Sequence, residues 1–94
     1  MVTIFTDEQI IAHNAKRETP CMTENGECFI VTKFRIYQEL PTIEVTDAQD
    51  VAVFATEREA VEYAAGMFRG YADMCIKYTY TIRAYCVDSM WRMA

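Results

Sequence analysis

The residues able to perform nucleophilic or acid–base chemistry are few in this sequence and lie far apart. There is one histidine, His13, and one serine, Ser89, near opposite ends of the 94 residues. A serine–histidine–acid triad requires both groups to meet beside an oriented carboxylate, which these positions disfavour. The alternative, a pair of His13 with Cys21 or Cys28, has no local signature motif to support it. We therefore predict that the chain is not an enzyme, and that His13 is a surface residue on a short helix.

The four cysteines are Cys21, Cys28, Cys75 and Cys86. None forms a C-x-x-C pair, so the sequence gives little support for a zinc site. Cys75 and Cys86 lie at opposite ends of one predicted strand, which at roughly 3.3 Å per residue places them beyond disulfide reach. We predict reduced thiols, mostly buried as small core residues, in a reducing compartment.

Ligand-binding motifs also receive little support. The three glycines, Gly26, Gly66 and Gly70, fit no phosphate-binding loop. Carboxylates at 44, 47 and 50 could hold a hard cation, but their segment lacks the spacing and the glycine of a calcium loop. A solvated acidic loop is the preferred interpretation, and no cofactor or metal is predicted.

The sequence has neither a run of about 18 apolar residues nor a signal-peptide pattern, so a cytoplasmic location is expected.

The net charge of −5 is concentrated in one segment, because residues 39–62 hold seven acids and one base. A solvated surface is the simplest interpretation of this segment. The functional alternative is a patch that docks on a basic protein surface, where charge raises association rates and fixes orientation. The candidate protein-binding residues are Glu44, Asp47, Asp50, Glu57, Glu59 and Glu62, together with Gly66 and Gly70.

Local signals predict two helices. Thr6 and Gln9 form a capping-box pattern that begins a short helix, which ends near Arg17 ahead of Pro20. A second capping box, 56–59, begins the clearest helix, with an apolar stripe at 60, 61, 64, 67, 68 and 71. Gly66 and Gly70, four residues apart on its polar side, either are tolerated at a modest cost in stability or form a shallow groove for a partner, a second copy or the chain's own tail with Trp91.

Alternating segments predict the strands. Asn25-Gly26 predicts a hairpin turn between a short strand, 21–24, and a long one, 27–38. In the long strand the face with Cys28, Ile30, Thr32, Phe34 and Ile36 carries no charge, so it is the predicted core face. Segments 43–45 and 51–55 predict further short pairing around an acidic loop, 47–50, and the last strand is predicted over 75–87.

The polar sides of the two long strands suggest a second surface. If the strands lie side by side, one face of the sheet combines basic residues with aromatic rings, which can contact phosphates and stack on bases. A solvated sheet face is the preferred alternative, because the net charge is wrong for an independent nucleic-acid binder. The residues of this candidate face are Lys33, Arg35, Tyr37, Lys77, Arg83 and Tyr85.

These elements predict a single α+β domain, residues 1–94. We expect a mostly antiparallel sheet of three to four strands, with one long helix packed on it and a short N-terminal helix.

A small, acidic, single domain of this kind resembles accessory proteins of bacteriophages, in particular the anti-CRISPR inhibitors. The segment Val53-Phe54-Ala55-Thr56-Glu57-Arg58-Glu59-Ala60 is similar to a strand-to-helix turn that is common in small phage proteins. The resemblance implies a location in the host cytoplasm and, as partner, a multi-subunit CRISPR effector with a basic nucleic-acid channel. It also implies that guide RNA is within reach of the basic sheet face.

The leading hypothesis is thus a non-enzymatic inhibitor that binds a host nucleic-acid-processing complex and blocks access of nucleic acid. The alternative is a self-associating structural or regulatory α+β domain with no nucleic-acid role. A small enzyme that uses a cysteine is the third hypothesis.

Overall fold

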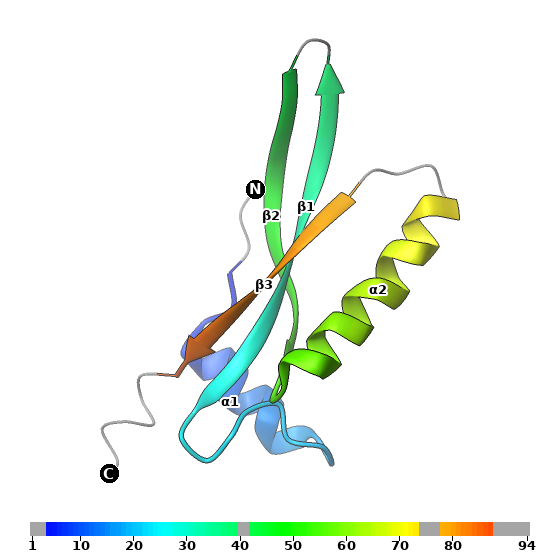
Figure 1. Ribbon diagram of the computed structural model, residues 1–94. Coiled ribbons are helices and arrows are strands. Elements are labelled where there is room, and N and C mark those ends of the chain that lie inside the picture. The colour runs from blue at the N-terminus through cyan, green and yellow to red at the C-terminus, as the bar shows by residue number, and fades with distance from the viewer. Residues whose placement is uncertain (1–3, 40–41, 74–77, 88–94) are drawn as a thin grey trace.

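The computed structural model describes residues 4–39, 42–73 and 78–87, with side chains described for 4–36, 47–67 and 78–87. Its elements follow the order α1 (Asp7–Lys16), β1 (Glu27–Glu39), β2 (Thr42–Phe54), α2 (Glu57–Asp73) and β3 (Tyr78–Cys86) (Figure 1). The helix α1 has 10 residues and α2 has 17. The α+β class is therefore confirmed.

The sheet of the described residues has three antiparallel strands in the order β2-β1-β3. The strand β3 pairs with residues 27–35 of β1, so the far ends of β1 and β2 continue beyond it as a two-stranded ribbon (Figure 1). This ribbon makes the molecule elongated, with extents of 52 × 22 × 18 Å. Its radius of gyration is 15.0 Å, whereas a compact chain of this length has about 12 Å.

The two helices cover opposite faces of the sheet, because neighbouring strand residues point to opposite sides. Ile30 belongs to a core cluster with Ile10 of α1, whereas Val31 belongs to a cluster with Ala60 and Ala64 of α2. Ile30 and Val31 are both fully buried. The prediction of a single core face was therefore wrong, since the sheet is apolar on both sides over the first half of β1.

One strand replaces the predicted short strands and acidic loop between 43 and 55. The pairing of β1 with β2 is shifted twice, and the first shift skips Val51, because Val31 pairs with Ala52 and Thr32 with Asp50. Such a bulge adds one residue to a strand and changes which side the following residues face. The second shift lies near Asp47, whose φ is 57°. The bulge at Val51 places Asp50 opposite Thr32, on the α1 side of the sheet.

The capping box at the start of α1 is confirmed. The Thr6 hydroxyl accepts from the Gln9 amide at 3.2 Å, and the Gln9 side chain accepts from the Thr6 amide at 2.9 Å. A turn does lie at Asn25-Gly26, with Gly26 at φ 80° and its amide donating to the Thr23 carbonyl at 3.0 Å, but it is not the predicted hairpin turn, because no strand precedes it among the described residues and only Gly26 of the two has a positive φ. The predicted strand 21–24 was wrong, because these residues form bends and a turn that lead from α1 into β1.

The helix α2 begins after Thr56, whose hydroxyl accepts from the Glu59 amide at 3.3 Å. Its contact with the sheet is made by alanines, since Ala60 and Ala64 are both fully buried. Small side chains let the helix backbone approach the sheet closely. Val61, predicted to belong to the apolar stripe, is 43% exposed.

Candidate functional site

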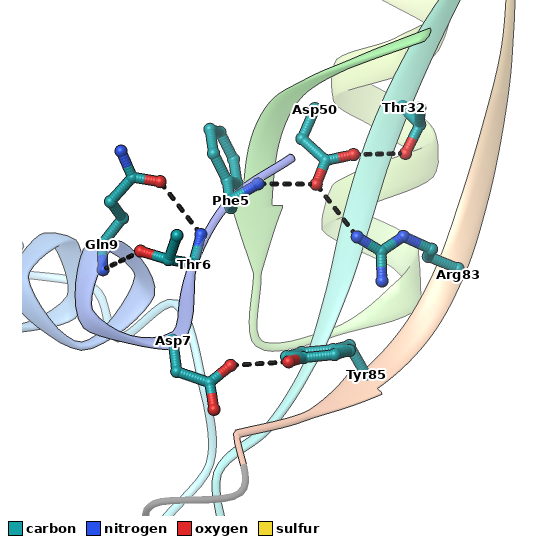
Figure 2. Close-up of polar contacts among 8 residues, drawn as sticks. All are labelled: Phe5, Thr6, Asp7, Gln9, Thr32, Asp50, Arg83 and Tyr85. Atoms are coloured by element: carbon teal, nitrogen blue, oxygen red, sulfur yellow. Dashed lines mark hydrogen bonds and ion pairs between the residues drawn. The ribbon is translucent and has the colours of Figure 1, made fainter. Parts of the chain in front are cut away.

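The buried carboxylate of Asp50 accepts from three donors that come from three parts of the chain (Figure 2). Its Oδ1 accepts from the Thr32 hydroxyl at 2.7 Å. Its Oδ2 accepts from the Phe5 amide at 3.0 Å and from the Arg83 guanidinium at 2.9 Å. A buried carboxylate is tolerated when hydrogen bonds and an opposite charge replace its water. Asp50 therefore ties the N-terminal segment, β1, β2 and β3 together.

A second carboxylate joins α1 to the sheet. The Tyr85 hydroxyl of β3 donates to Asp7 at 2.6 Å, and the Arg83 guanidinium lies 5.3 Å from the centre of the Tyr85 ring (Figure 2). Both carboxylates are thus occupied by donors from β3, and the arrangement positions α1 against the sheet. Sequence reasoning missed this cluster, because no local pattern distinguishes Asp50 from its acidic neighbours.

The fold exposes only part of the predicted acidic patch among the described residues. Asp50 does not belong to it, since this residue is only 3% exposed and fully engaged inside the sheet. Asp47 is exposed on β2, whereas Glu57 and Glu62 are exposed on α2. Glu59 is half-buried and accepts from the Thr56 hydroxyl at 2.9 Å. The side chain of Glu44 lies outside the described residues.

The predicted basic face is divided between the two sides of the sheet. Lys33 pairs with Tyr80 in the strand register, whereas Arg83 pairs with Ile30, which points to the side of α1. Lys33 and Arg35 therefore share the α2 side, and Arg83 and Tyr85 lie on the α1 side. The prediction that these residues form one surface was wrong, because it aligned the two strands one residue out of register. Lys77 and the side chain of Tyr37 lie outside the described residues.

Two of the described thiols are buried, as predicted, in the cluster on the α1 side. Cys21 and Cys28 are free thiols and fully enclosed, whereas Cys86 is half-buried and its thiol donates to the Asn25 carbonyl at 3.5 Å. Desolvation by burial raises the pKa of both buried thiols, and the pKa of Cys28 rises to about 11. Since the thiolate is the nucleophilic form, these groups are poor nucleophiles at neutral pH. Cys75 lies outside the described residues.

The raised pKa of Cys28 predicts a loss of stability at alkaline pH. The pKa rises from 9.0 in the free thiol to about 11 in the folded chain, so unfolding releases a proton between these values. The stabilisation is complete below pH 9 and declines as the pH approaches 11, by about 2 kcal/mol. Denaturant titrations in reductant at several pH values measure this slope. Cys28→Ala should make the slope shallower, and an unchanged slope would contradict the assignment to Cys28.

Gly66 faces open space, because a Cβ built there meets no atom within 4 Å. The described part of the chain therefore does not fill the groove that the glycine pair predicts. Position 70 falls within α2 but its surroundings, like Trp91, lie outside the description. An external occupant of this groove stays a prediction.

A groove of about 200 Å³ lies between α1 and β2, with His13 and Gln9 among its polar lining and Phe5 and Ile10 among its apolar lining. Pockets that bind small molecules commonly measure about 300–1,000 Å³ and converge several polar groups on the ligand. Here the single histidine stands on the exposed side of α1. The groove does not bring His13 together with either buried thiol.

Within the described residues, no cluster of three or more His, Cys, Asp or Glu side chains is arranged to hold a metal ion. Neither described helix has the length and apolar character needed to cross a membrane. Comparison of the chain with protein-family models, with curated proteins and with solved structures finds no match.

Proposed function

We propose that this chain is a non-catalytic inhibitor that binds a basic protein surface of a nucleic-acid-processing complex and excludes nucleic acid from it. The observation that carries the proposal is the acidity of residues 39–62, of which Asp47, Glu57 and Glu62 remain exposed in the fold. Basic channels that hold a phosphate backbone also attract carboxylates, so an acidic domain competes there with nucleic acid.

The beginning of α2 is the best defined part of this acidic surface. Glu57 and Glu62 are exposed, and the neighbouring Arg58 forms an ion pair with Glu62 at 3.3 Å. Both side chains of this pair are more than half exposed, so the pair contributes little to stability. The carboxylates can therefore exchange partners and meet a basic surface without a loss of fold.

The positions of the reactive groups support a binding role. The carboxylate of Asp50 is occupied by three donors from the chain itself, and the raised pKa values of Cys21 and Cys28 keep these thiols protonated. The resemblance to anti-CRISPR inhibitors suggests CRISPR effectors as the first class of partner to test.

The test is the binding of the purified chain to guide-loaded CRISPR effector complexes, with association rates measured over a range of salt concentrations. We expect association to slow as salt increases, since exposed charges are screened beyond a Debye length of about 8–10 Å. The double variant Glu57→Lys/Glu62→Lys should slow association by about tenfold or more at low salt. It should also restore nucleic-acid binding by the effector.

The matched control is Glu8→Lys/Glu24→Lys, which makes the same charge change at two exposed positions outside the acidic segment. If both double variants slow association equally, net charge alone acts and the α2 surface is not the contact. If the effector complexes do not bind the chain at any salt concentration, CRISPR complexes are not the partner class.

A second candidate function, a self-associating structural or regulatory domain, is favoured by a different observation. The strand β3 at one edge of the sheet is long and nearly uncharged.

A further inference from the structure

The two edges of the three-stranded sheet differ in how they are protected. The edge strand β2 contains two register shifts, a positive φ at Asp47 and several acids. The Arg17 side chain also donates to the Val53 carbonyl of this strand at 3.1 Å. Bulges, charges and covering groups of this kind prevent a further strand from adding to an edge. The edge at β2 is therefore protected against the addition of another strand.

The strand β3, the opposite edge of the described sheet, shows none of these devices. Its register with β1 runs from Tyr78 to Cys86 without a shift, and it contains neither proline nor glycine. Six of its nine residues are Tyr, Thr or Ile, which favour strands. Its one charged residue, Arg83, is paired with Asp50 of its own chain. An edge of this length and composition is a template for strand pairing.

We propose that β3 pairs antiparallel with β3 of a second copy of this chain, giving a two-fold dimer with a continuous six-stranded sheet. A two-fold axis through Ile82 sets Ile82 opposite its own counterpart and Tyr80 opposite Ala84, a large side chain against a small one. Thr81 then lies opposite Arg83, whose charge Asp50 already balances. The same strand therefore supplies both sides of a matched ladder.

Charge favours the second copy as the occupant. The strand β3 holds one charged residue, Arg83, whereas Glu44, Asp47 and Asp50 belong to β2, at the other edge of the sheet. Pairing across β3 therefore keeps the acidic β2 strands of the two copies at opposite ends of the joined sheet, although each chain carries −5. The ladder also adds cover to Ile82 and Tyr80, which are only half-buried against the α2 core.

Analytical ultracentrifugation of the full chain over a range of concentrations tests this proposal. The wild-type chain should sediment as a dimer, and Thr81→Lys/Ala84→Lys should weaken dimerisation by about tenfold or more, because lysines on an edge strand oppose pairing. Both positions are exposed, and circular dichroism should show that the variant keeps its fold. The matched control Ala12→Lys/Ala65→Lys adds the same charge at exposed helix positions and should remain dimeric.

Three outcomes overturn the proposal. One is a wild-type chain that stays monomeric at all concentrations, and another is a dimer that both double variants weaken equally. The third is a monomer whose β3 amides become protected from hydrogen exchange only when an effector complex is added, which would assign the edge to a strand of another protein. The charge-based function does not predict a dimer, so failure of the dimer leaves that function to its own test.

Discussion

Replacing Asp50 with alanine should destabilise the folded chain by about 3 kcal/mol, because it removes a buried acceptor shared by three donors. The Thr32 hydroxyl is buried and loses its partner, whereas Arg83, whose side chain is 39% exposed, can turn toward water. The Phe5 amide loses the bond that holds the N-terminal segment to β2. Chemical denaturation measures the free energy of unfolding, and Asp50→Asn separates the loss of charge from the loss of the acceptor.

A matched control is Glu24→Ala, which removes an exposed acid near the turn before β1 and should change stability by no more than about 0.5 kcal/mol. Thr32→Val should cost less than Asp50→Ala, since Asp50 keeps its two other donors. If Asp50→Ala proved as mild as the Glu24 control, Asp50 would belong to the solvated acidic surface after all. A charge reversal meant to test docking should therefore avoid Asp50.

The local elements of the fold could be predicted from the sequence because their signals act over a few residues. A hydroxyl at Thr6 or Thr56 caps the helix that follows, whatever the rest of the chain does. Gly26 adopts a positive φ because a turn requires it there. These signals predicted where α1, α2 and β1 begin.

The placement of Asp50 could not be predicted, because it depends on a bulge. Without the extra residue at Val51, the pairing of Val31 with Ala52 would continue to Thr32 with Val51, and Asp50 would take the opposite side of the sheet. A bulge is fixed by how two strands fit over their whole length, and no composition marks it here. The acidic segment is therefore continuous in sequence but divided in space.

The prediction that only one face of the sheet is buried was also wrong, although the sequence of β1 contains evidence for burial on both faces. Phe29 and Val31 are as apolar as Cys28 and Ile30, and β1 carries no charge between Glu27 at its start and Lys33. A continuous apolar run in a strand indicates burial on both faces. The charges of the second half of β1 led to the choice of one face for the whole strand. That choice also placed Lys33 and Arg83 on the same side.

Because β1 is buried on both faces, truncating a core side chain on either face should have a large effect on stability. Ile30→Ala and Val31→Ala should each destabilise the chain by about 2–4 kcal/mol, because each truncation leaves a cavity in a fully enclosed site. Ile30 packs in the cluster that includes Ile10 and Cys28, and Val31 packs against Ala60 and Ala64. The two variants therefore test the contacts of α1 and α2 separately.

Equilibrium unfolding in denaturant gives both free energies, with Thr81→Ala as the control at an exposed position of β3, where the cost should stay below about 1 kcal/mol. Val31 is the largest fully buried side chain of the cluster on that side, where α2 contributes alanines. Val31→Ala should therefore also increase hydrogen exchange of the α2 amides, whereas Ile30→Ala should do so for α1. If Val31→Ala were as stable as the Thr81→Ala control, the packing of α2 would not bury this face of the sheet.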